Sequence, residues 1–241
     1  METGERGLYE DDVAAILGYL RVPPEIRQEL MGMVRAGSER NWHEISGAPM
    51  PRILRDLTRF ENEATTIYNF EPLLLPGLVQ AAEYARTLIR LAAPGRTEEE
   101  IENMVAVRMN RQRVLDRADP PQLRLIIEEM ALRRTMGDPA MMIGQLQHLL
   151  AASARQHISI QVLPFDAESA VAMHGPLIIV ECPDQPTICY EDSRSASTIL
   201  EDEEFVGRAT LAWKRLSAAA RSADDSRRLI SELASQLRGV V

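Results

Sequence analysis

Two prolines four residues apart constrain the fold of this chain more than any other feature. Pro72 and Pro76 lie in the segment Phe70–Arg86, FEPLLLPGLVQAAEYAR, and they exclude a helix through the three leucines between them. Gly77 permits backbone angles that other residues avoid. The pattern predicts an extended segment that fills the core, followed by a helix. Apolar residues recur at helical spacing at Leu78, Ala82, Ala85, Ile89 and Ala92.

Alternation of apolar and polar residues predicts the strands of a sheet. Strands are expected at 65–70, 123–127, 158–162, 176–182 and 187–192. The second and third are separated by a helix that begins at Asp138-Pro139, so they should be parallel and joined by a right-handed crossover. The last two flank a turn at Pro183–Pro186 and should form an antiparallel hairpin. The sequence therefore predicts an α/β fold, with a small mixed sheet surrounded by helices.

The net charge of −9 limits the partners that the chain can bind non-specifically. An acidic surface disfavours unspecific binding to nucleic acid and to anionic membranes. The composition is 45% hydrophobic and 26% charged, which is ordinary for a soluble protein. Apolar runs are short and no signal peptide is recognised, so no membrane contact and a cytoplasmic location are expected.

Cysteines and histidines form no metal-binding pattern. Cys182 and Cys189 flank the predicted hairpin turn, and we expect free thiols there, although the position leaves a disulfide open. The four histidines are scattered without a partner ligand at helical spacing. Phosphate-binding loops and activated nucleophiles are not recognised either. The sequence predicts neither a metal nor a cofactor.

The first part of the chain predicts two short helices. Asp11 or Asp12 can cap a helix that ends near Leu20, and Pro23-Pro24 starts a second one. Glycine, serine and proline then indicate a linker, in which Trp42 is expected to dock onto the following domain. We expect three parts: a helical segment at 1–40, a linker at 41–52 and a large domain at 53–241.

The helix that follows the Thr97–Glu100 capping box has an unusual face. The face begins with apolar residues and continues through Arg108 and Gln112, and burying such groups without partners costs about 1–3 kcal/mol each. Either the helix rotates to bury Met104 and Met109, or Arg108 and Gln112 face a polar pocket. A pocket should lie near the carboxyl ends of the strands, be lined by at least two of Arg108, Gln112, Glu129 and Glu191, and be roofed by the 165–175 loop.

One group of polar residues forms a candidate site. Glu129 follows the strand at 123–127 on its buried face, where sheets of this class commonly bind ligands, and Arg108 is a suitable partner. A structural salt-bridge network between helix and sheet would use the same residues. Both interpretations stay open. The set consists of Glu71, Arg86, Arg108, Gln112, Glu129 and Glu191.

An ordered series of short motifs extends along the chain. The motifs are Glu71-Pro72, Pro76-Gly77-Leu78, Gln80, Tyr84-Ala85-Arg86, Arg108 with Arg111-Gln112, Glu129 with Leu132-Arg133, Val162-Leu163-Pro164-Phe165, Gly175-Pro176, Tyr190 with Glu191, and Ser226 with Leu229-Ile230. In this order they resemble the XRE-type, lambda-repressor-like helix-turn-helix regulators that carry a large C-terminal domain of unknown function, often described as antitoxin-like. The resemblance adds Tyr190 to the ligand-binding candidates. It also implies transcription regulation, often beside a small partner protein.

The resemblance is incomplete at the start of the chain. Glu2-Thr3-Gly4 is similar to the end of the family's recognition helix, and 12–20 and 24–35 are similar to the two helices that follow it. The 1–40 segment would then be a remnant of a helix-turn-helix domain, because the helix that enters the major groove is not present. Binding to DNA is not expected for the chain as given. Met1 is either a true truncation or a start assigned too late.

The expected function is a sensory or partner-binding domain of a regulator-like protein, for a small-molecule ligand or a small partner protein. The alternative is a cofactor-independent enzyme of cyclase or isomerase type, with Glu129 and Glu191 as acid and base and Arg108 holding an anionic substrate. A protein that only sequesters a partner is a third interpretation. Apolar stripes on the N-terminal helices predict a homo-oligomer, or helices that fold back onto the main domain.

Overall fold

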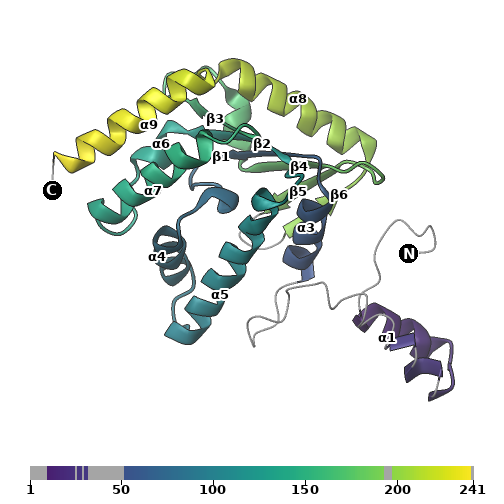
Figure 1. Cartoon of the computed structure of the whole chain (residues 1–241). Helices are drawn as coiled ribbons and strands as arrows, with labels where there is room; N and C mark the ends of the chain where they lie inside the picture. The colour runs from purple at the N-terminus through teal and green to yellow at the C-terminus, as the bar shows by residue number, and fades with distance from the viewer. Residues whose placement is uncertain (1–9, 25, 29, 32–51, 193–196, 240–241) are drawn as a thin grey trace. The chain divides into compact units, whose positions relative to one another are not determined.

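The computed structural model describes residues 10–24, 26–28, 30–31, 52–192 and 197–239, and the chain divides into two compact units, 1–45 and 46–241 (Figure 1). In the first unit α1 covers Glu10–Tyr19, and residues 24, 26–28, 30 and 31 are also helical. Asp11 and Asp12 therefore lie inside α1, so the predicted capping position was wrong. Val13 and Leu17 are buried, as one face of an amphipathic helix should be. The predicted contact of Trp42 lies outside the described residues.

The second unit is built on a six-stranded mixed sheet with the order β3-β2-β1-β4-β5-β6. The strands are β1 (Thr66–Glu71), β2 (Gln122–Glu128), β3 (Ile158–Leu163), β4 (Leu177–Glu181), β5 (Ile188–Asp192) and β6 (Ser197–Leu200). β1, β2 and β3 pair in parallel, and β4, β5 and β6 continue the sheet antiparallel from β1. The predicted parallel pair with its crossover helix and the predicted hairpin are confirmed. The central place of β1 and the strand β6 were not foreseen.

Helices cover both faces of this sheet (Figure 1). They are α3 (Arg52–Glu63), α4 (Ala82–Ala92), α5 (Glu98–Arg111), α6 (Glu129–Arg133), α7 (Pro139–Ser153), α8 (Glu203–Ala219) and α9 (Ala223–Arg238), with 3-10 turns η2 (Gly77–Val79), η3 (Gln112–Asp116) and η4 (Ala170–His174). α8 lies on one face, and α3, α4, α5 and α7 lie on the other. Together with the sheet they confirm the predicted α/β class.

Successive side chains of a strand point to opposite faces of the sheet, so they pack in two different apolar cores. On β1, Ile67 points to the large core with α3, α4, α7 and α9, whereas Phe70 points to a smaller core against α8. Both residues are fully buried. On the α8 side the ring of Trp213 packs edge-on against Tyr68 at a centroid distance of 5.1 Å.

Two predicted helix starts are confirmed at the level of single hydrogen bonds. Thr97 and Glu100 form a complete capping box at the start of α5. At the start of α7 the side chain of Asp138 accepts from Met141 N at 2.7 Å, and Pro139 occupies the first turn. Gly77 has no positive φ, so the conformational freedom expected there is not used; among the described glycines with positive φ are Gly95, Gly137 and Gly175.

The edge of the sheet at β3 is covered by the turn between α8 and α9 together with the first residues of α9. Val162 N donates to the hydroxyl of Ser226 at 2.8 Å, and Val162 O accepts from Arg221 N at 2.9 Å. Ser226 is fully buried. An exposed strand edge favours aggregation, so this turn both satisfies and shields β3.

The described part of the chain contains no helix that is both long and apolar enough to span a membrane. Within the same residues, histidine, cysteine and acidic side chains do not gather in groups of three that could hold a metal ion. Cys182 and Cys189 are free thiols, and Cys189 is buried.

Candidate functional site

A cavity of about 500 Å³ lies on the face of the sheet opposite α8, beside the carboxyl end of β1. Its floor comes from β1, β4, β5 and β6, and its walls come from α3, α4, α5 and the segment after β1. Ligands of α/β sheets are commonly bound beyond the carboxyl ends of the strands. The lining residues are Leu54, Leu57, Asn69, Glu71, Pro72, Leu73, Leu74, Leu75, Gly77, Gln80, Leu88, Arg108, Arg111, Pro176, Ile178, Tyr190 and Ser197.

Glutamine amides hold the segment that forms one wall of this cavity. Gln80 donates to Leu75 O at 2.7 Å, and Gln145 on α7 donates to Val79 O at 2.9 Å. Gln112 donates to two carbonyls of the segment, at 2.9 and 2.8 Å. Both Gln80 and Gln145 are buried. Their amides donate to backbone carbonyls that have no helical hydrogen bond, because the prolines prevent a helix in this segment. The predicted non-helical segment after Pro72 is confirmed, and its hydrogen bonds are made by side chains.

One of the two arginines on the cavity wall is neutralised. Arg111 Nε and Nη2 donate to the carboxylate of Glu61 on α3 at 2.6 and 2.9 Å. The exposed fractions are 12% for Arg111 and 2% for Glu61. Burial alone would lower the pKa of Arg111, but the charge and hydrogen bonds of Glu61 outweigh it and the pKa is raised. This pair is a structural clamp between α3 and α5.

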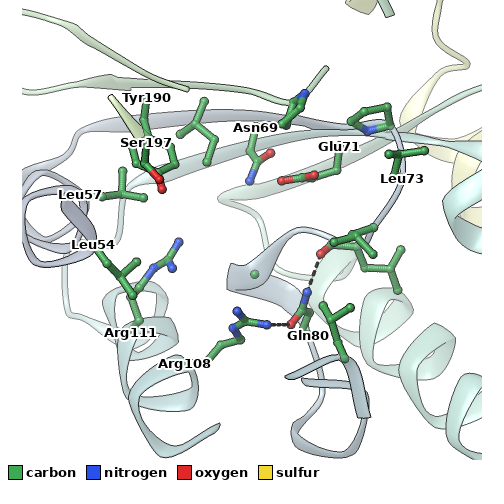
Figure 2. Close-up of a pocket in the computed structure, with 17 residues that line it drawn as sticks. Leu54, Leu57, Asn69, Glu71, Leu73, Gln80, Arg108, Arg111, Tyr190 and Ser197 are labelled. Atoms are coloured by element: carbon green, nitrogen blue, oxygen red, sulfur yellow. Dashed lines mark hydrogen bonds between the residues drawn. The ribbon is translucent and has the colours of Figure 1, made fainter. Parts of the chain in front are cut away.

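The second arginine, Arg108, has no such counter-charge. Its Nη1 donates to the side-chain oxygen of Gln80 at 2.8 Å, and among the described residues no carboxylate lies within ion-pair distance of its guanidinium (Figure 2). Burial, with the positive charge of Arg111 nearby, lowers the pKa of Arg108 to about 10. Arg108 is therefore a cation at neutral pH that lines the cavity and is only partly exposed to water.

The floor carries a buried polar group that lacks a partner. Asn69 is 3% exposed, and its Oδ1 has no hydrogen-bond partner among the described residues. Figure 2 shows its amide on the sheet side of the cavity, across from Arg108, with the carboxylate of Glu71 beside it. An acceptor left unsatisfied in this way costs about 1–3 kcal/mol. The cavity thus has an arginine without a carboxylate partner among the described residues on one wall, and on its floor an asparagine whose side-chain oxygen is buried and unpaired.

A protein-family model matches residues 54–232 of the chain, which span the sheet, the cavity and most of α9. Its description is "Domain of unknown function (DUF5753)". The chain belongs to the DUF5753 family. Comparisons with curated proteins and with solved structures found no match.

The DUF5753 domain brings together three of the seven candidates from the sequence. Glu71, Arg108 and Tyr190 all line the cavity. Gln112 lies behind its wall, where it holds the segment after β1. Arg86 does not take part: it pairs with Glu83 at 2.6 Å and with Glu102 on the exposed side of α4 and α5.

The two remaining candidates are separated from Arg108, so the predicted pairing was wrong. Glu129 is buried on α6 and accepts from Arg133 at 2.7 Å, four residues further on the same helix. Glu191 follows Tyr190 on β5 and therefore points to the opposite face of the sheet, where it lines a second cavity of about 280 Å³. This second cavity contains Val171 and His174 of η4, so the 165–175 loop roofs it and not the Arg108 cavity.

The alternative for α5 in which Arg108 and Gln112 both face a polar pocket agrees with the structure for Arg108 alone, because Gln112 donates to backbone carbonyls behind the cavity wall. Met104 is 38% exposed, so the helix has not rotated to bury it. Within the described residues the expectation that at least two of Arg108, Gln112, Glu129 and Glu191 line one cavity was wrong, since Arg108 alone of them lines the larger cavity and Glu191 alone lines the smaller one. The partners of Arg108 on the cavity wall come from other parts of the chain.

Sequence reasoning missed Asn69, Gln80 and Arg111 as site residues. The sequence does contain an indication for Asn69. It lies two residues after Ile67 on the same strand, so its polar amide is on the same, buried face of the sheet as Ile67. Gln80 and Arg111 are part of the motif series but carry no sign in the sequence of what they contact. The Arg111–Glu61 pair joins residues 50 positions apart, and only the packing of α3 against α5 reveals it.

Proposed function

We propose that the DUF5753 domain of this chain is the sensory, small-molecule-binding domain of a regulator-like protein, and that Arg108 holds an anionic group of the ligand. The observation that carries the proposal is the position of Arg108, a cation on the wall of a cavity without a carboxylate partner among the described residues. A cation that is partly removed from water is costly unless it is paired. A carboxylate or phosphate on a ligand supplies that partner through charge-assisted hydrogen bonds.

The size and lining of the cavity support a small organic ligand. Its volume of about 500 Å³ lies within the ~300–1,000 Å³ that is common for small-molecule sites. Six of the lining residues are leucines, from α3, α4 and the segment after β1, and a few polar groups lie among them. Such a surface favours a ligand with an apolar body and one charged end.

Regulation of transcription is supported by the motif series, from Glu71-Pro72 to Leu229-Ile230, through its resemblance to XRE-type regulators. A separate observation tests this half of the proposal. An open reading frame that continues in frame upstream of Met1 and encodes the first helices of a helix-turn-helix domain would support it. A stop codon and a ribosome-binding site directly upstream of Met1 would contradict it.

Binding is better supported than the enzymatic alternative. Acid–base catalysis needs both groups within reach of the same substrate. Glu191 lines the cavity on the α8 side, Arg108 lines the cavity on the other side, and Glu129 is held by Arg133. The proposed acid, base and anion-binding residue therefore do not share a site.

Matched pairs of compounds test the binding half of the proposal. Each pair consists of a carboxylate with an apolar body and its primary amide, and binding is measured by calorimetry and by the shift in melting temperature. Wild-type protein should bind carboxylates at least tenfold more tightly than the amides, since a charge-assisted hydrogen bond contributes about 1.5–3 kcal/mol. Arg108→Met should remove this preference, whereas Arg113→Met, an exposed arginine on η3, should keep it. Equal binding of acids and amides by wild-type protein would contradict the proposal.

A further inference from the structure

Gln80 connects the wall of the cavity to Arg108. Its side-chain oxygen accepts from Arg108 Nη1 at 2.8 Å, and its side-chain nitrogen donates to Leu75 O at 2.7 Å (Figure 2). A guanidinium can only donate and a carbonyl can only accept, so these two partners determine which end of the amide faces which group. Gln80 is 2% exposed and lines the cavity, as Arg108 does. The amide is therefore held in one orientation at the cavity wall.

The backbone around Gln80 is held by side chains from two helices. Gln80 O accepts from Gln112 Nε2 at 2.8 Å, and Gln112 lies four residues after Arg108 at the end of α5. The next residue is held from α7, because Ala81 N donates to Gln145 Oε1 at 2.6 Å. An acceptor that is fixed by its own hydrogen bonds limits the positions of the group that donates to it. The guanidinium of Arg108 thus has a fixed point of attachment to the wall.

The acceptor that Gln80 presents to Arg108 is neutral. Arg111, three residues further along α5, meets the carboxylate of Glu61 instead. A carboxylate cancels the charge of an arginine, and its charge-assisted hydrogen bonds are stronger than those of a neutral amide. A guanidinium also has several N–H donors, of which the described residues engage Arg108 through a single hydrogen bond. Arg108 is therefore held in place while its charge and its other donors stay open to a ligand.

We infer that Gln80 is a positioning residue of this site, which holds the guanidinium of Arg108 with a neutral acceptor and so lets the cavity select an anionic group. The inference rests on the proposed function, because the anion of the ligand is what the position of Arg108 serves. It adds a second residue to the selectivity, one that belongs to the wall. A carboxylate in the place of this amide should pair with Arg108 and exclude the anion of the ligand.

Gln80→Glu tests this inference, since the substitution keeps the length and shape of the side chain and changes its charge. The probes are phenylbutyrate and phenylbutyramide, which share an apolar body and differ in charge. Calorimetry with the full chain at pH 8, where an ordinary carboxyl group is ionised, measures both affinities. Wild-type protein should bind the acid at least tenfold more tightly than the amide. Gln80→Glu should bind the two compounds with nearly equal affinity, because the introduced carboxylate neutralises Arg108.

Gln145→Glu is the matched control for damage to the wall. Gln145 is also a buried glutamine, and it donates to a carbonyl of the same wall, Val79 O, at 2.9 Å. Its side chain bonds to Val79 O and Ala81 N and not to Arg108. Damage to the wall should weaken binding of the acid and of the amide alike, so this variant should keep the preference for the acid. Melting curves establish first that each variant is folded.

Gln80→Met decides the question if Gln80→Glu shows no cooperative melting transition. It keeps the length of the side chain and removes the acceptor, so Arg108 loses its attachment to the wall without gaining a counter-charge. The preference for phenylbutyrate should fall at least threefold below that of wild-type protein, because a guanidinium that is no longer held pays an ordering cost when it binds the carboxylate. A purely structural Gln80 would weaken binding of both compounds equally and leave the preference unchanged.

The outcomes separate this inference from the proposed function. Loss of the preference in Gln80→Glu, with the preference kept in Gln145→Glu, supports the inference. A preference that survives in Gln80→Glu, or one that is lost in Gln145→Glu as well, overturns the inference, while the preference of wild-type protein still supports the proposed function. Equal binding of acid and amide by wild-type protein, or no binding by any carboxylate of the matched pairs, overturns the proposed function and the inference together.

Discussion

Arg111 on α5 and Glu61 on α3 are joined by two nearly parallel hydrogen bonds, of 2.6 and 2.9 Å, inside a part of the domain that water hardly reaches. Three residues earlier on the same helix, Arg108 makes a single hydrogen bond, to a neutral glutamine. Two arginines of one helix therefore have opposite energetic roles. Removing a charge should be costly at the first and cheap at the second.

Glu61→Gln should lower the free energy of unfolding by about 3–5 kcal/mol, because Arg111 keeps its charge and loses its counter-charge in a buried site. Urea unfolding at pH 7 measures the loss. Glu63→Gln, an exposed neighbour on α3, is the control and should stay within about 0.5 kcal/mol of wild-type protein. The double variant Glu61→Leu with Arg111→Met should lose less than Glu61→Gln alone, and a larger loss in the double variant would contradict this account.

Arg108→Met should change the free energy of unfolding by no more than about 1 kcal/mol. The variant loses one hydrogen bond to Gln80, but it also removes a desolvated charge whose pKa burial lowers to about 10. Arg113→Met provides the exposed comparison. A loss of 3 kcal/mol or more in Arg108→Met would show that this arginine is structural, and the proposed function would then lose its main support.

Ser226→Ala should lower the free energy of unfolding by about 1–3 kcal/mol. The substitution removes the hydroxyl that accepts from Val162 N and leaves a buried N–H of β3 unpaired. Ser235→Ala, further along α9 and exposed, removes a hydroxyl that bonds only within its helix and should be nearly neutral. Amide hydrogen exchange should locate the effect at Val162, and unchanged protection there would argue against the proposed role of Ser226.

The two thiols should react slowly with iodoacetamide in the folded protein. Desolvation is the main cause that raises the pKa of Cys182 and of Cys189 to about 11, with the charges of Glu63 and Glu191 adding to it. At pH 8 only about one thiol in a thousand is then ionised, against roughly a tenth or more for an ordinary cysteine. Mass spectrometry should show alkylation at least tenfold slower than in 8 M urea. Rapid labelling of Cys189 in the folded state would contradict its burial.

The sequence was sufficient for features that depend on local order. The alternation at 123–127 and 158–162, the Thr97–Glu100 box and the Asp138-Pro139 start are each contained within a few residues, and each appears in the structure as expected. β6 was missed because its four residues are too short to display a period. The place of β1 between β2 and β4 depends on pairings across more than fifty residues, which no local pattern encodes.

The candidate site was predicted only in part, and the reason is geometric. Tyr190 and Glu191 are adjacent in sequence, yet a strand sends them to opposite faces and into different cavities. Glu129 found a partner four residues away instead of the distant Arg108, because a helix brings such neighbours together. Charge complementarity alone could not show whether Glu129 pairs with Arg133 or with Arg108. The assembly expected from the N-terminal helices stays a prediction.

The amides of Gln80, Gln112 and Gln145 have a consequence for how the cavity responds to its surroundings. A glutamine side chain does not take up or release a proton in the ordinary pH range, and its hydrogen bonds are hardly screened by salt. The wall that these amides hold should therefore keep one shape from acidic to alkaline solution and from low to high ionic strength. Any dependence of binding on acidity must then come from the charges of the ligand or of the groups that meet it, so the cavity is suited to report the chemistry of a molecule rather than the state of the solution.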